Sequence, residues 1–184
     1  MMLQMLPYYG IGFLLMGFIA VAVYTQRRSI KLTSDSWDVL VGRVEQVNVA
    51  GLRAVALDYL DPTEHQTRIQ PEELWTLVGG EVGLRRMRAN ADLMLALAAH
   101  AQHWNFEEAT IVGERMRRDC LRLRGAVLRI ELGMLRYSLL QRFSVYAPFH
   151  LQEAAGAYYL MRQRLLALCS TSHAGRYQGL AATL

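Results

Sequence analysis

The first 26 residues of this 184-residue chain carry no charged side chain. Within them, residues 8–24 form an uninterrupted run of apolar, aromatic and glycine residues. A helix of that length rises about 25 Å, and the apolar residues before Tyr8 lengthen it enough to cross a hydrocarbon core with some tilt. The sequence therefore predicts a transmembrane anchor at residues 1–26.

The two ends of this apolar run differ in charge. No lysine or arginine precedes the run, whereas a basic cluster follows it at once. By the positive-inside rule the basic flank stays in the cytoplasm. We therefore expect a single-pass protein of the inner cell membrane, with its C-terminal domain cytoplasmic and membrane lipids among its partners. The aromatic and basic residues expected at the membrane interface are Tyr8, Tyr9, Tyr24, Arg27, Arg28 and Lys31.

Two other interpretations of the apolar run stay open. Ala20-Val21-Ala22 resembles the small-residue cleavage site of an export signal, and cleavage there would release a chain that begins at Val23. The missing basic residues before the run argue against that signal. The run is also compatible with a helix buried in a protein core.

Beyond the anchor, the composition is that of a globular domain. We expect a basic juxtamembrane linker at residues 27–35, a helical bundle at residues 36–169 and a loosely ordered tail at residues 170–184. Both cysteines, Cys120 and Cys169, fall in apolar helical patterns, which predicts buried thiols rather than a disulfide.

Apolar periodicity and capping signals predict an all-α fold, an antiparallel bundle of four to five helices. The expected helices cover residues 37–60, 72–78, 81–104, 106–143 and about 148–169. The first is ambiguous, because its valines partly alternate and would also suit a strand pair. Pro71 and Pro148 mark helix starts, and Gly79-Gly80 marks a break.

The segment 106–143 has two apolar rows. One row repeats at alternating steps of four and three: Met116, Cys120, Leu123, Val127, Ile130, Met134 and Tyr137. The second lies on roughly the opposite side: Leu121, Leu128, Leu132, Leu135 and Leu139. Two apolar faces predict a central helix that packs against neighbours on both sides. If the second row is not covered within one chain, we expect a dimerisation surface there.

The same segment carries a stripe of arginines. Arg115, Arg122, Arg129 and Arg136 are seven residues apart, and Arg118 joins the edge of the stripe. A seven-residue step turns only about 20° around a straight helix, so these side chains share one side. The stripe suits phosphates of lipid headgroups or an acidic protein, and equally the solvated face of a helix buried elsewhere. Few aromatic residues interleave the arginines, which disfavours nucleic acid as a partner.

No enzyme signature emerges. His100 and His103 have the spacing of two metal ligands, but no further ligand motif accompanies them. Cys169 and His173 would form a thiolate pair only if the last helix continued past Ser170. We therefore expect no metal, no cofactor and no catalytic site.

The sequence predicts a membrane-anchored interaction or scaffold module, which holds a protein partner or a second copy of itself. One alternative is a domain that binds anionic lipid or an acidic ligand through the arginine stripe. Another is a metal-binding or enzymatic helical protein that uses His100 and His103.

Overall fold

The computed structural model describes residue 16 and residues 35–61, 69–102, 106–140, 147–172 and 174–184. The chain divides into two units between Asp35 and Ser36. The first unit is described only at Met16, which is helical, and at Asp35. The predicted membrane-interface residues Tyr8, Tyr9, Tyr24, Arg27, Arg28 and Lys31 all lie outside the described residues.

Within the part of the chain that the structure describes, no helix has both the length and the apolar character needed to cross a membrane. The predicted anchor falls almost wholly on residues that are not described. It therefore stays a prediction.

The second unit confirms the all-α prediction, because every regular element among its described residues is a helix. There are seven such helices, more than the four or five expected. The additional ones arise because residues 37–60 form two helices and residues 174–183 form another. Their bounds are α2 Trp37–Gly42, α3 Val49–Leu60, α4 Pro71–Val78, α5 Gly80–Ala101, α6 Phe106–Leu140, α7 Ala147–Ser172 and α8 Ala174–Thr183.

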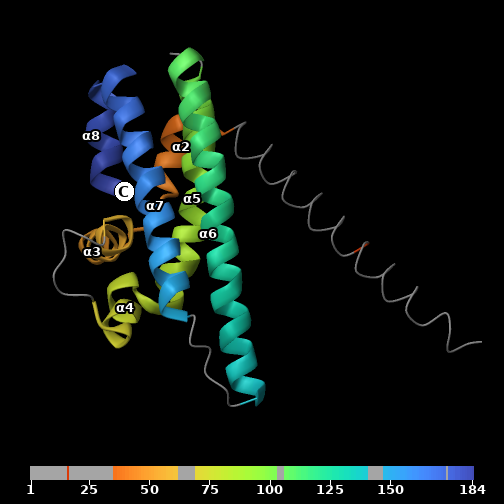
Figure 1. Cartoon of the computed structure of the whole chain (residues 1–184). Coiled ribbons are helices and arrows are strands. Elements are labelled where there is room, and N and C mark those ends of the chain that lie inside the picture. Colours follow the sequence, from red (N-terminus) through yellow and green to blue (C-terminus); the bar gives the residue numbers. More distant parts are fainter. Residues whose placement is uncertain (1–15, 17–34, 62–68, 103–105, 141–146, 173) are drawn as a thin grey trace, which may run out of the picture. The chain divides into compact units, whose positions relative to one another are not determined.

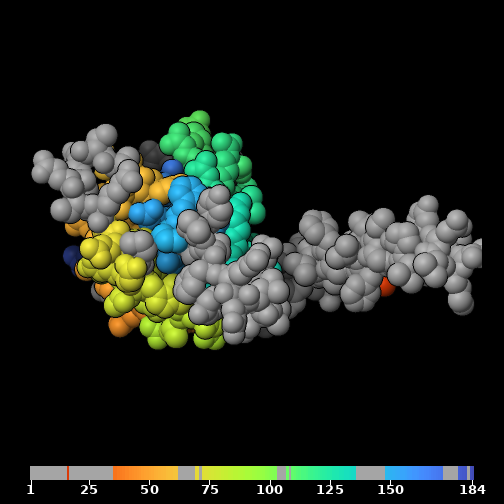
Figure 2. All heavy atoms as spheres, turned by 60° about the horizontal axis from the view of Figure 1, so that its bottom comes forward, coloured from red at the N-terminus to blue at the C-terminus, as the bar shows by residue number. Residues whose placement is uncertain are grey.

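The long helices α5, α6 and α7 lie side by side, and their chain direction alternates from one to the next (Figure 1). Helix α8 runs along α7, and α3 crosses the long helices, so that it is seen nearly along its axis in this view. Helix α7 lies at the centre, in contact with α3, α4, α5, α6 and α8. In Figure 2 it lies between α4 and α6, and α6 forms one side of the unit.

This arrangement corrects the expectation that residues 106–143 form the central helix. Helix α7 is buried on nearly all sides, through residues such as Leu151, Tyr158, Met161 and Leu165. Small residues allow close packing: a Cβ added at Gly156 would lie 2.8 Å from Cδ1 of Tyr59 on α3. Buried residues are spread around most of α7, which places α7 rather than α6 at the centre.

Residues 37–60 were expected to form one helix, which is wrong. Helix α2 ends at Gly42, and α3 begins only at Val49. The side chain of Asn48 ends the connection by accepting a hydrogen bond from the backbone N–H of Gly51 at 3.0 Å. Its amide also donates to the carbonyl of Leu77 on α4, at 3.1 Å. The asparagine cap therefore starts a new helix and ties it to a neighbour.

The break at Gly79-Gly80 is confirmed. Gly79 has φ of 84° and Gly80 has φ of 60°, both in the left-handed region that favours glycine. The turn brings α4 and α5 so close that a Cβ added at Gly83 would collide with the carbonyl oxygen of Val78. The chain thereby turns at Gly79 from the short helix α4 into the long helix α5.

The C-terminal segment also differs from the expectation. Helix α7 extends to Ser172, and residues 174–183 form α8 instead of a loosely ordered tail. Helix α8 contacts α7 and α2, and the side chains of Leu180 and Leu184 are buried. A short segment without clear apolar periodicity is helical here, and two leucines four residues apart lie in the core.

Candidate interaction surface

The inner side of α6 packs as its first apolar row predicts. Met116, Cys120, Leu123, Val127 and Ile130 are all buried. They face α5 and α7, the two helices in contact with α6. This row is therefore part of the core.

The second apolar row is not covered. The side chains of Leu121, Leu128, Leu132 and Leu135, here called the leucine row, are 66%, 53%, 49% and 55% exposed. They lie on the outer side of α6, which was expected to pack against a further helix. Among the described residues no element covers them, so that part of the prediction is wrong. The side chain of Leu139 lies outside the described part of the chain.

The spacing of the leucine row is that of a coiled-coil seam. Steps of four and three from Leu128 through Leu132 to Leu135 keep these side chains on one narrow side of the helix. Gly125 occupies the seam position between Leu121 and Leu128. A Cβ added at Gly125 would meet only the guanidinium of Arg129, at 4.0 Å, so the seam is also open there. The outer side of α6 thus has the geometry that receives one further helix.

The arginine stripe runs beside the leucine row. Arg115, Arg118, Arg122 and Arg129 are all exposed on α6. Arg136 lies on the same helix, but its side chain is outside the described part. The structure therefore brings four of the five predicted arginines together on one surface, next to the exposed leucines.

Acidic residues already neutralise part of this stripe. Arg118 pairs with Glu114 at 3.7 Å, and Arg129 pairs with Glu153 of α7 at 3.2 Å. Both arginine side chains are more than half exposed in these pairs, so each pair adds little stability and exchanges easily with other partners. Arg115 has no acidic partner among the described residues. The stripe therefore retains positive charge that a ligand can use.

A buried acid anchors the stripe to the core. Asp119 is only 3% exposed and forms an ion pair with Arg164 of α7. Arg122 reaches the same carboxylate at 4.0 Å. Burial, together with the positive charge of Arg115, lowers the pKa of Arg164. Asp119 and Arg164 hold α6 in a fixed rotation against α7.

Ion pairs to α5 fix the other flank of the leucine row. Arg124 pairs with Asp92, and Glu131 pairs with Arg88 at 3.6 Å. With the pairs to α7 on the opposite flank, α6 is tied on both sides. The leucine row is consequently directed away from the bundle.

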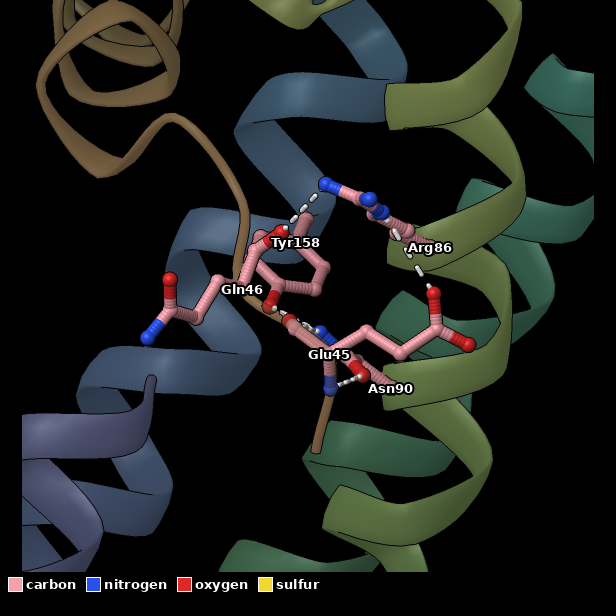
Figure 3. Close-up of polar contacts among 5 residues, drawn as sticks. All are labelled: Glu45, Gln46, Arg86, Asn90 and Tyr158. Carbon is pink, nitrogen blue, oxygen red and sulfur yellow. Dashed lines mark hydrogen bonds and ion pairs between the residues drawn. The ribbon is translucent and has the colours of Figure 1, made fainter. Parts of the chain in front are cut away.

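A polar cluster joins buried residues of α5 and α7 to the connection between α2 and α3 (Figure 3). The Asn90 side chain of α5 accepts a hydrogen bond from the backbone N–H of Glu45 at 2.9 Å and donates to its carbonyl at 2.7 Å. The same amide donates to the hydroxyl of Tyr158 at 3.1 Å. Arg86 adds a bond to the carbonyl of Gln46 at 3.0 Å and an ion pair with the Glu45 carboxylate at 3.5 Å.

These bonds fix the connection between α2 and α3 against α5 and α7. The Asn90 amide pairs with both backbone groups of Glu45, in the connection between α2 and α3, and so satisfies them within the protein. Burial raises the pKa of Tyr158 despite the hydrogen bond from Asn90, so the hydroxyl stays neutral. The sequence did not predict these hydrogen bonds of Asn90, here called the Asn90 clamp. An asparagine among the apolar positions of α5 was nevertheless a visible signal.

The described residues offer little for metal or thiol chemistry. They contain no group of three or more His, Cys, Asp and Glu side chains that could hold a metal ion. His100 is on α5, whereas His103 and His173 lie outside the described residues. Cys120 and Cys169 are buried thiols, as predicted, and burial raises the pKa of Cys120 from 9.0 to about 11. A thiol with so high a pKa is a poor nucleophile at neutral pH.

No protein-family model, no curated protein and no solved structure matches this chain. The candidate surface is therefore assigned from its own geometry.

Proposed function

We propose that this protein is a membrane-anchored helical interaction module, and that its bundle docks another protein on the outer side of α6. The observation that carries this proposal is the exposed leucine row. Four leucines, each about half or more exposed, follow one another at coiled-coil spacing on a helix that is otherwise firmly packed.

Exposed leucines in such a row are unfavourable for an isolated bundle. Fully burying one leucine is worth roughly 1.5–3 kcal/mol, and soluble surfaces rarely carry large contiguous apolar patches without a binding role. Ion pairs on both flanks hold the row outward, so it does not turn into the core. A partner that covers the row would recover this free energy.

The predicted anchor would hold the bundle at the membrane. The uncharged residues 1–26 and the basic residues that follow support a single transmembrane helix in the inner membrane, with the bundle on the cytoplasmic side. A module tethered in this way confines its partner to the membrane surface, where the local concentration of both proteins rises.

A second candidate function is binding of anionic lipid or an acidic ligand by the arginine stripe. The exposed guanidinium groups of Arg115, Arg118 and Arg122 favour it. Two observations weigh against a purely electrostatic site: Arg129 is already paired with Glu153, and the leucine row beside the stripe adds nothing to phosphate binding.

Site-specific photocrosslinking of the full chain in its native cells tests the docking surface. A photoreactive amino acid at Leu128 or Leu132 should give a discrete protein adduct. The matched control is Gln163, an exposed position on α7. Adducts at Gln163 that equal those at Leu128, or none at either leucine, would contradict the proposal.

The anchor is tested separately by fractionation. We expect the full chain to stay in the membrane after carbonate washing, and its bundle to be protected from protease in sealed, right-side-out membranes. A protein released in soluble form that begins at Val23 would instead identify an export signal.

A further inference from the structure

We infer that the occupant of the leucine row is an amphipathic helix with acidic side chains along its edges, and not a second copy of this chain. This inference rests on the proposed docking function and adds the chemistry of the partner. It follows from the charges that border the row on each side.

The leucine row defines the register of the seam. With Leu128 and Leu135 at d and Leu132 at a, the arginines Arg115, Arg122 and Arg129 all fall at the e position. Arg136 continues that series along α6. One whole edge of the seam is therefore arginine.

The opposite edge, position g, is mainly basic as well. It holds Arg117, Arg124 and Glu131 in successive heptads. Arg117 pairs with Glu114 at 3.3 Å, whereas Arg124 and Glu131 are tied to α5. A helix that lies on the seam thus meets guanidinium groups on both sides along the first two heptads.

A second copy would set like charges against each other at most of these positions. In an antiparallel pair the e positions of the two helices face each other, which sets arginine against arginine in every heptad. In a parallel pair g faces the e position of the next heptad, which sets Arg117 against Arg122 and Arg124 against Arg129. Like charges across a seam disfavour pairing, so the sequence of α6 acts against self-association through this face.

An acidic helix satisfies the same positions. Carboxylates at its edges would form charge-assisted, often bidentate hydrogen bonds with the arginines, while its apolar row covers the leucines. The intramolecular pairs of Arg118 with Glu114 and of Arg129 with Glu153 are exposed. A partner's carboxylates can therefore replace or join them at little cost.

A lipid surface suits this face less well. Helices that lie in a bilayer interface present a broad apolar side, usually with tryptophan or phenylalanine. The leucine row is narrow and contains no aromatic residue. Glu114, seven residues before Leu121, also places a carboxylate at a d position of the same seam. These features favour a partner helix over a membrane.

The test uses three designed helical peptides with the full chain in nanodiscs. All three carry leucine at a and d, and they differ only in glutamate, glutamine or lysine at e and g. Fluorescence anisotropy should show the glutamate peptide binding at least about tenfold more tightly than the glutamine peptide, and the lysine peptide more weakly still. The preference should decrease as salt screens the charges.

Two variants sharpen the result. Arg122→Glu with Arg129→Glu should reverse the order of the glutamate and lysine peptides. Arg122→Gln with Arg129→Gln should remove the preference without adding repulsion, and circular dichroism should show unchanged helicity in both. Equal affinity for all three peptides, or a preference that survives both variants, would overturn the inference.

Two other outcomes would also overturn it. One is a photoadduct at Leu128 that contains a second copy of the chain. The other is a photoadduct that contains only lipid. The proposed function fails differently: Leu128→Ser with Leu132→Ser would then leave unchanged the protein adducts formed by a photoreactive amino acid at Leu135, which lies on the same row. A protein adduct that those leucines require, together with equal peptide affinities, keeps the docking function and rejects the acidic partner.

Discussion

Helices α6 and α7 each carry apolar residues on more than one side, but only α7 is covered on most of its sides. Helix α7 has alanine and glycine between its larger side chains, and five helices pack against it. Helix α6 has arginines between its leucines, and its outer side remains open. Short side chains allow neighbouring helices to pack closely around α7. On α6, arginines at seven-residue spacing border the leucines, and no helix among the described residues packs there.

The contrast separates two uses of leucine in one small domain. On α7 leucine stabilises the fold, and on the outer side of α6 it is available to a partner. Matched substitutions on the two helices can therefore test whether the outer side is as exposed as the structure indicates.

The largest contrast is expected for the same truncation at two leucines. Leu165→Ala on α7 removes a side chain with no exposed surface, and should lower the free energy of unfolding by about 2–5 kcal/mol. Leu128→Ala should change it by less than about 0.5 kcal/mol. Denaturant unfolding of the full chain in mild detergent measures both. Comparable losses at the two positions would mean that the leucine row is packed after all.

Thiol labelling compares the two sides of α6 directly. A cysteine introduced as Leu128→Cys should react with iodoacetamide at pH 8 at least about a hundredfold faster than Cys120, because Cys120 is buried and its pKa is raised to about 11. Peptide mass mapping gives both rates in one sample. Equal rates would contradict the assignment of inner and outer sides.

The raised pKa of Cys120 predicts that the free energy of unfolding depends on pH. Because folding raises the pKa of Cys120 from 9.0 to about 11, the folded state favours the protonated thiol. This contribution to stability is complete below about pH 9 and is lost as pH rises through 11. The variant Cys120→Ala should lack that loss, which unfolding measured across this pH range would reveal.

The smallest contrast comes from two glycines. Gly156→Ala would bring a Cβ within 2.8 Å of Tyr59, and should lower the free energy of unfolding by about 1–3 kcal/mol. Gly125→Ala adds a methyl group in open space on the leucine row, and should raise it by about 0.5–1 kcal/mol through helix propensity. Thermal unfolding distinguishes the signs. Destabilisation by Gly125→Ala would indicate close packing on the outer side of α6.

Much of the fold follows from local patterns. Pro71 and Pro148 predicted helix starts, and Gly79-Gly80 predicted a break, because these residues restrict or free the backbone by themselves. The split within residues 37–60 was not predicted, since the Asn90 clamp comes from a residue far along the chain. Helix α8 was not predicted for a similar reason, because it has no clear apolar periodicity of its own and packs against α2, which is distant in the chain, and against α7.

The candidate site was predicted in part. The heptad steps of the leucines and of the arginines are visible in the sequence, and a helix necessarily aligns each set on one side. The sequence could not show that the leucine row is exposed, because a row of leucines has the same pattern whether a neighbour covers it or not.

The sequence by itself determined an all-helical domain, the seam on α6 and its border of arginines, since each depends only on local backbone geometry and helical period. Only the tertiary structure decided that α7 occupies the centre and that α6 turns its leucine row outward. Those outcomes depend on which helices meet, and on ion pairs such as Asp119 with Arg164 that join residues distant in the chain.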